Sequence, residues 1–125
     1  MVTEHPNSVW RKLEKIALIG LALSSILGME VKGQELSAEK GKGLYQRLCS
    51  TCHGKAGTVD RYGLFDPPPA DLKDPATQKK TDEELLNAIR NGHPNTAMGN
   101  WEYALSGEEM KDVLAYIRTL WGTTS

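Results

Sequence analysis

The segment Cys49-Ser50-Thr51-Cys52-His53 contains both cysteines of this 125-residue chain and a histidine directly after the second one. On a helix, side chains three and four positions apart share one face, so Cys49, Cys52 and His53 can address one flat object from one side. The pattern C-x-x-C-H is the attachment sequence for a c-type haem. In that use the two thiols bond covalently to the porphyrin edge, and the imidazole ligates the iron.

Other uses of a C-x-x-C pair meet specific objections. A thioredoxin-like motif needs strand–helix–strand surroundings, whereas this motif lies in a helical pattern with no alternating strand beside it. A structural zinc site needs four ligands, and the only further histidine in the body of the chain, His93, has no paired ligand beside it. Two idle thiols are rare in an exported chain. Haem attachment is therefore the favoured interpretation.

The first third of the chain predicts export. Basic residues precede an uncharged apolar run at residues 16–29, which is the arrangement of a signal peptide. As a helix rising about 1.5 Å per residue, the run spans roughly 21 Å and falls short of the ~30 Å hydrocarbon core of a membrane. We expect residues 1–33 to be a signal peptide, with an uncleaved N-terminal anchor as the alternative. Residues 34–125 then form one domain.

The composition of the chain limits the classes of function. A domain of this length is marginal for a core built from side chains alone, and a large apolar cofactor would complete that core. The formal net charge of −1 gives nucleic-acid binding no electrostatic support. The chain has no internal repeat, so a single domain is the economical interpretation.

The first predicted helix leads into the cysteines. Ser37 is its expected N-cap, and the helix continues through Tyr45. Gly41 and Gly43 each cost about 1 kcal/mol relative to alanine in a helix interior. We therefore expect a neighbouring element to pack closely against the backbone at these glycines.

Capping boxes predict two further helices. Thr81 and Glu84 open a short amphipathic helix that stops at Asn91-Gly92. Ser106 and Glu109 open the last one, which Gly122 ends and whose apolar face comprises Met110, Val113, Leu114, Ile117, Leu120 and Trp121.

Between the first two helices, residues 54–80 contain too many glycines and prolines for regular structure. They predict a long ordered loop that wraps around a functional object, in an all-α domain.

The loop at residues 92–101 offers two candidate iron ligands. His93 lies just past a helix end, where a histidine is most often a solvated cap. Met98 lies in the middle of the loop, outside any apolar periodicity that would explain it as a core residue. We favour Met98 as the second axial ligand, and His93 stays the alternative.

With these features, residues 36–121 resemble the small bacterial class I cytochromes c, which carry a single haem. The resemblance implies thioether links from Cys49 and Cys52 to one haem c, with His53 as the proximal ligand and Met98 as the distal ligand. It also implies the class I fold, in which three main helices and long loops surround the haem.

The resemblance assigns further residues to the haem pocket. In the family, a proline carbonyl accepts the proximal imidazole N–H and a leucine contacts the haem. The segment 67–72 matches this pattern and implies Pro69 and Leu72 as pocket residues. Trp101 is a third pocket residue, since Trp101 or Tyr103 could donate a hydrogen bond to a haem propionate.

The family pattern also concerns the helix crossing and the distal loop. In the family, the first helix crosses the last one where a small residue meets an aromatic one. Gly41 and Tyr45 on the first predicted helix, opposite Tyr116 on the last, match this pattern. A proline usually follows the distal methionine, whereas Gly99 stands there in this chain. The resemblance therefore predicts a less rigid loop around Met98.

The function that the resemblance implies is one-electron transfer, without a small-molecule substrate and without enzymatic activity. A neutral thioether ligand and burial of the haem both favour a moderately high reduction potential. We expect redox proteins or membrane electron-transfer complexes as partners, in the periplasm, with the N-terminal segment as a route to a membrane tether. The alternatives are a haem subunit held in a respiratory or photosynthetic membrane complex, and a haem peroxidase or gas sensor with an open coordination position.

Overall fold

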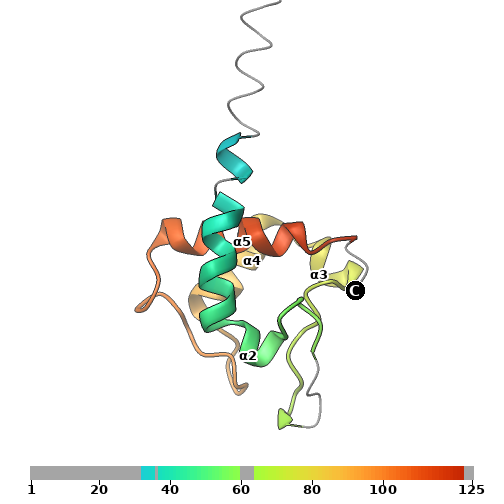
Figure 1. Ribbon diagram of the computed structural model, residues 1–125. Helices are drawn as coiled ribbons and strands as arrows, with labels where there is room; N and C mark the ends of the chain where they lie inside the picture. Colours follow the sequence, from blue (N-terminus) through green and yellow to red (C-terminus); the bar gives the residue numbers. More distant parts are fainter. Residues whose placement is uncertain (1–31, 36, 60–63, 123–125) are drawn as a thin grey trace, which may run out of the picture. The chain divides into compact units, whose positions relative to one another are not determined.

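The computed structural model describes residues 32–35, 37–59 and 64–122. These residues contain helices and connecting loops but no strand, so the predicted all-α class is confirmed (Figure 1). Residues 32–35 and 37–48 are helical, and the further helices are α2 (Ser50–His53), α3 (Pro75–Gln78), α4 (Asp82–Asn91) and α5 (Gly107–Thr119). None of the helices in this part of the chain has the length and apolarity needed to span a membrane.

The chain divides between Gly33 and Gln34 into two units, and α2 to α5 all belong to the second unit. The uncharged run at residues 16–29 and its basic flank lie outside the described residues. The assignment of residues 1–33 as a signal peptide or anchor therefore stays a prediction.

Both predicted capping boxes are present. The Thr81 hydroxyl accepts a hydrogen bond from the Glu84 N–H, and the Glu84 carboxylate accepts one from the Thr81 N–H at 2.7 Å. Ser106 and Glu109 form the same reciprocal pair at the start of α5. These hydrogen bonds favour the ionised carboxylates and hold the pKa of both glutamates below its usual range. The N-termini of α4 and α5 are thus set by local sequence.

The helix ends match the sequence less closely. Helix α4 stops at Gly92, with φ of 65°, as the sequence predicts. Helix α5 already ends at Thr119, ahead of the expected stop at Gly122. Trp121, which the sequence pattern places on the buried face, lies past the helix end and is 52% exposed. That placement of Trp121 is wrong, because the helical periodicity no longer applies there.

Two other expectations about the helices are corrected. Ser37 is itself helical, and its hydroxyl donates a hydrogen bond to the Asp112 side chain instead of starting the helix. The first helix ends at residue 48, and Cys49 forms a turn before α2. Helical backbone hydrogen bonds nevertheless continue through this turn. The Cys49 N–H donates to the Tyr45 carbonyl at 2.9 Å, and the His53 N–H donates to the Cys49 carbonyl at 2.9 Å.

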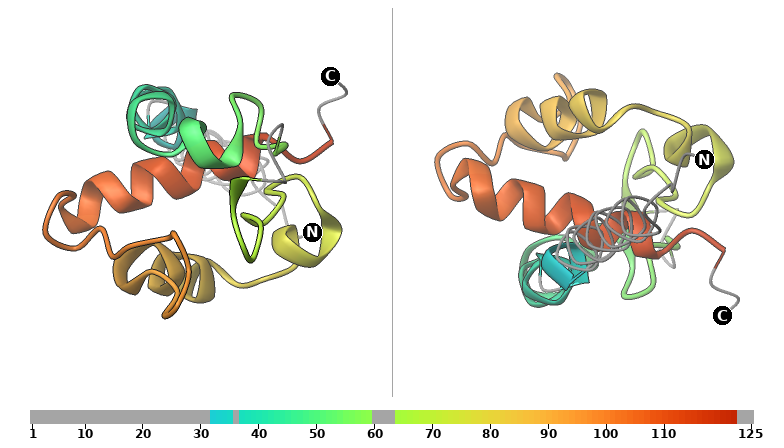
Figure 2. Two further views of the ribbon diagram at one scale, coloured as in Figure 1. Left: turned by 90° about the horizontal axis from the view of Figure 1, so that it is seen from below. Right: turned by 90° about the horizontal axis from the view of Figure 1, so that it is seen from above.

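The helix at residues 37–48 crosses α5 at very short range, and Figures 1 and 2 show the crossing. A Cβ atom on Gly41 would lie 1.8 Å from the Asp112 carbonyl oxygen, so only glycine fits between the two backbones. One turn further on, the rings of Tyr45 and Tyr116 meet with their centroids 5.1 Å apart. The expected close approach at Gly41 is confirmed. At Gly43 it is wrong, since a Cβ there would meet only the Arg47 side chain, at 3.6 Å.

In its described residues, the long segment between α2 and α4 is mostly loop, as predicted, but it contains the short helix α3. Asp74 caps that helix by accepting from the Ala76 N–H, and Pro75 occupies its first turn. This combination is a sequence signal for a helix start that the count of glycines and prolines obscured.

Arg118 of α5 fastens the end of this long segment. Its guanidinium donates to the Gln78 carbonyl at 2.7 Å, to the Lys80 carbonyl at 2.6 Å and to the Asp82 carboxylate at 2.7 Å. The Gln78 amide in turn donates to the Leu72 carbonyl at 2.6 Å and to the Ile117 carbonyl at 3.1 Å. Side-chain hydrogen bonds thus join the loop to α5.

The contrast between the two glycines gives a matched pair of substitutions. We expect Gly41→Ala to lower the free energy of unfolding by at least about 1–3 kcal/mol, because the new methyl group overlaps the backbone of α5. We expect Gly43→Ala to be neutral or to raise it by up to about 1 kcal/mol, because alanine is the better helix former and has room. Urea unfolding of the two variants measures both values, and equal effects would contradict the crossing described here.

Candidate functional site

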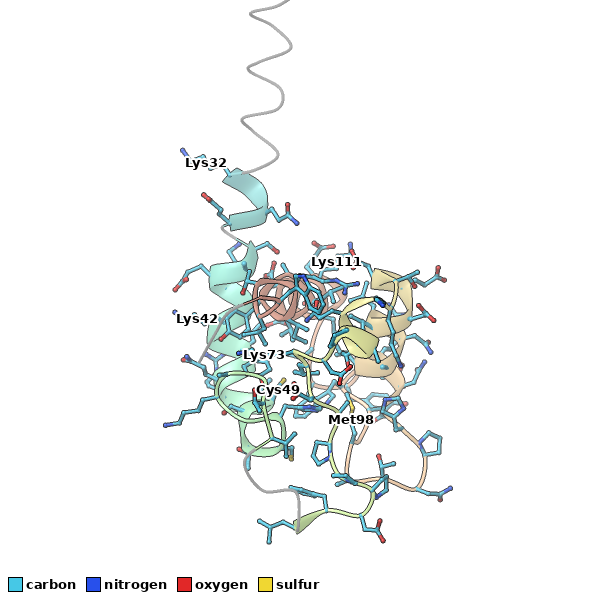
Figure 3. All side chains as sticks on the ribbon, turned by 90° about the vertical axis from the view of Figure 1, so that its right-hand side faces the viewer. Lys32, Lys42, Cys49, Lys73, Met98 and Lys111 are labelled. Carbon is cyan, nitrogen blue, oxygen red and sulfur yellow. The ribbon has the colours of Figure 1, made fainter. Side chains whose placement is uncertain are left out.

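A cavity of about 350 Å³ lies between the helix at residues 37–48, α2, the loop before α3, α4, the loop before α5, and α5. This volume is within the range of small-molecule sites. Every side chain that the sequence assigns to the haem site lines it, namely Cys49, Cys52, His53, Pro69, Leu72, Met98 and Trp101. Figure 3 shows Cys49 and Met98, which come from distant parts of the sequence. The fold therefore brings the predicted thiols, imidazole and thioether to one space.

The imidazole of His53 is held in one orientation. Its Nδ1 lies 3.0 Å from the carbonyl oxygen of Ala70. Because a carbonyl can only accept, Nδ1 carries the proton and Nε2 keeps its lone pair. Burial lowers the pKa of His53, so the neutral ring that a metal requires is favoured. The family resemblance implied a proline carbonyl as the acceptor, whereas the structure has the carbonyl of Ala70, the residue after Pro69.

The electrostatics of the thiols argue against redox catalysis. Burial, with a smaller effect of the neighbouring Cys52, raises the pKa of Cys49 to about 11. Redox-active C-x-x-C motifs instead have a lowered pKa, because the thiolate is the reactive form. Within the described part of the chain, no cluster of three His, Cys, Asp or Glu side chains is arranged to hold a metal ion by itself.

Tyr45 and Gly54 fix the backbone where the C-x-x-C-H motif ends. The Tyr45 side chain is fully buried, and its hydroxyl donates to the Gly54 carbonyl at 2.7 Å. Gly54 has φ of 75°, and a Cβ on it would lie 1.9 Å from the Thr58 carbonyl oxygen. The chain therefore turns sharply after the motif. The sequence identified Tyr45 as a helix-crossing residue but not as an anchor of the motif.

Met98 lies in a compact loop that closes on itself. The His93 N–H donates to the Met98 carbonyl at 3.0 Å, and the Met98 N–H donates to the Thr96 hydroxyl oxygen at 3.1 Å. A Cβ on Gly92 would lie 2.4 Å from the Met98 carbonyl oxygen, so glycine is needed at the base of this loop. His93 lines the cavity as well, and both candidate ligands thus remain beside it.

Only one of the two candidate propionate donors lines the cavity. Trp101 lines it and packs against the core, whereas Tyr103 does not line it and is 86% exposed. Thr77 and Lys80 line the cavity too, and no sequence pattern predicted them. Their inclusion depends on how α3 and the following turn fold back against α5.

The residues around the cavity fit a covalently attached haem. Two thiols stand beside an imidazole with an available lone pair, a thioether lies in the facing loop, and most of the other lining side chains are apolar. Axial ligation by histidine and methionine is the ligand set of electron-transferring cytochromes c. An all-α domain with this cavity is that of a c-type cytochrome.

Comparison with known proteins agrees with this class. The chain belongs to the family described as cytochrome c oxidase, cbb3-type, subunit III, whose model matches residues 36–117. The solved structure of the KustC0563 c-type cytochrome is similar, with 29% sequence identity and a TM-score of 0.58 over 65% of this chain and 96% of that one. No curated protein matches. The protein is a monohaem c-type cytochrome with covalently bound haem c, a class that transfers electrons.

The buried hydroxyl of Tyr45 can be tested separately from its ring. We expect Tyr45→Phe to lower the free energy of unfolding by about 1 kcal/mol, because the Gly54 carbonyl loses the buried hydrogen bond that the Tyr45 hydroxyl donates. Tyr103→Phe is the control, since that ring is exposed, and it should change stability little. Thermal unfolding measures both variants. A Tyr45→Phe variant as stable as its control would show that the hydroxyl does not anchor the motif.

Proposed function

We propose that this cytochrome is a one-electron carrier in an exported electron-transport chain. Cys49 and Cys52 form the thioether links to the haem, His53 is the proximal iron ligand and Met98 is the distal one. One observation carries this proposal: these four side chains, from two distant segments, line a single cavity.

The bound haem would supply one-electron exchange, and the chain would set its potential. The Ala70 carbonyl fixes the His53 ring and increases the basicity of its free nitrogen, as acceptors behind metal-bound histidines do. The Met98 thioether adds no charge and favours ferrous iron. The apolar walls of the cavity disfavour the additional charge of the ferric state. The thioether and the apolar walls favour a moderately high reduction potential, and the more basic His53 ring acts in the opposite direction.

The same ligand assignment argues against catalysis. With His53 and Met98 both occupied as iron ligands, no coordination position is free for a substrate or a gas. A peroxidase or gas sensor would need such a position. The protein therefore needs only weak contacts with its redox partners, and electrons pass through the haem edge.

The location and the mode of association form a separate part of the proposal. We propose that residues 1–33 direct export and that residues 34–125 act in the periplasm. The second candidate function is that of a haem subunit held permanently in a respiratory membrane complex. The description of the matched family as an oxidase subunit favours that candidate. An uncleaved N-terminal segment would then serve as its membrane anchor.

Intact-mass measurement of the purified protein, combined with a pyridine haemochrome spectrum, tests attachment and processing together. We expect a mass equal to the processed polypeptide plus one haem, and a spectrum typical of two thioether links. Cys52→Ala should shift the spectrum to that of a haem with one remaining thioether. A mass without haem would refute the proposal. A native protein that retains residues 1–33 and co-purifies with a membrane complex would favour the subunit function.

Substitution of Met98 tests the distal ligand. We expect Met98→Ala to abolish the thioether–iron band at the red end of the visible spectrum. The reduction potential should fall, within the roughly 0.8 V range that axial ligands control. The wild-type protein should bind carbon monoxide and cyanide slowly at neutral pH. A persistent thioether band in the variant would exclude Met98 as the ligand, and rapid ligand binding by the wild type would favour the sensor or peroxidase alternative.

A further inference from the structure

The loop at residues 92–99 carries two side chains with donor atoms suited to haem iron. His93 and Met98 both line the cavity that contains His53. The iron ligated by His53 would therefore have an imidazole and a thioether within the same small region of the cavity.

The backbone joins these two residues at one point. The His93 nitrogen lies 3.0 Å from the Met98 carbonyl oxygen, which makes residues 93–98 a closed loop. The Thr96 hydroxyl donates to the His93 carbonyl at 2.8 Å and accepts from the Met98 N–H at 3.1 Å. Both side chains thus start from adjacent positions on one hydrogen-bonded loop.

The residue after Met98 leaves the loop open on one side. A Cβ on Gly99 would have no heavy atom within 4 Å, so the chain is open on that side, while the Gly99 carbonyl lies close to Gly92 on the other. Gly99 also lacks the fixed φ and the missing N–H of a proline at the same position.

We infer that His93 is a second distal ligand for the haem iron, which takes the place of Met98 when the thioether sulfur leaves. This inference rests on the proposed function, because it requires His53 and Met98 as the axial pair. In the exchange, the iron–sulfur bond of Met98 breaks and a bond from a nitrogen lone pair of His93 forms. No proton or electron is transferred in this step.

The exchange would have a defined chemical consequence. Thioether sulfur is a soft donor that favours ferrous iron, whereas imidazole nitrogen stabilises the ferric state better. His93 would thus keep the oxidised protein six-coordinate and closed to external ligands whenever Met98 dissociates. The carrier would be protected against capture by cyanide or a gas in the state in which its methionine bond is weakest.

Replacement of Met98 by an isosteric residue exposes the reserve ligand. We expect haem-loaded Met98→Leu to lose the thioether–iron band yet to remain low-spin, with His93 as its sixth ligand. The double variant Met98→Leu/His93→Gln should be high-spin, and its ferrous form should bind carbon monoxide about tenfold faster or more than that of Met98→Leu, because no internal ligand competes. Absorption and electron paramagnetic resonance spectra with stopped-flow mixing measure these differences.

The outcomes separate this inference from the proposed function. A high-spin Met98→Leu that binds carbon monoxide as fast as the double variant would overturn the role of His93 and leave the Met98 assignment intact. Persistence of the thioether band in Met98→Leu would instead overturn the assignment of Met98. Added imidazole should restore a low-spin spectrum in the double variant, which verifies that its pocket is intact.

A second test leaves Met98 in place. The loop is held by backbone groups and the Thr96 hydroxyl, so His93→Gln removes the imidazole without removing a hydrogen bond of the loop. We expect ferric His93→Gln to bind cyanide several-fold faster than the wild type. Asn95→Gly is the matched control, because it alters the same loop at a residue with φ of 60° and removes no iron ligand. Equal cyanide binding by wild type and His93→Gln would contradict the inference.

Discussion

The contact of Gly41 with the backbone of α5 is the constraint on which the position of the haem motif depends. The two helices approach so closely that no side chain fits between Gly41 and the Asp112 carbonyl. This approach brings Tyr45 against Tyr116, and the buried Tyr45 hydroxyl reaches on to the Gly54 carbonyl directly after the motif. A single helix crossing thereby sets the distance between the C-x-x-C-H segment and the wall of the cavity that α5 provides.

On the opposite side of the cavity, hydrogen-bonded loops position the lining residues. Arg118 and Gln78 tie the loop after α2 to α5, and the Ala70 carbonyl in that loop orients His53. Beyond α4, the closed loop at residues 93–98 presents Met98. The orientation of His53, the predicted proximal ligand, thus depends on long-range hydrogen bonds, whereas that of Met98, the predicted distal ligand, depends on bonds within a few residues. Changes in the distal loop can therefore alter ligation without loss of the fold.

Features that are encoded within a few residues could be predicted from the sequence. The capping boxes at Thr81 and Ser106 and the stop at Gly92 each follow from local chemistry, and the structure confirms them. A close approach was predicted at Gly41 and Gly43 alike, and it is present only at Gly41, because it depends on a helix distant in sequence. The partner of His53 could not be derived in this way, because Ala70 offers only a backbone carbonyl that every residue has. Trp121 was misplaced because periodicity does not reveal where a helix ends. The ligand roles themselves depend on an iron atom and stay predictions.

The hydrophobic core and the cavity are largely the same set of side chains. Of the buried cluster, Tyr45, Leu72, Ile89, Leu105, Val113 and Ile117 also line the cavity. The apolar surface of a haem would therefore complete the packing of these residues, as a domain this small requires. A cofactor that binds only the folded chain adds its binding free energy to stability, and covalent links keep that contribution from being lost by dissociation. Attachment through Cys49 and Cys52 would thus serve folding as well as electron transfer.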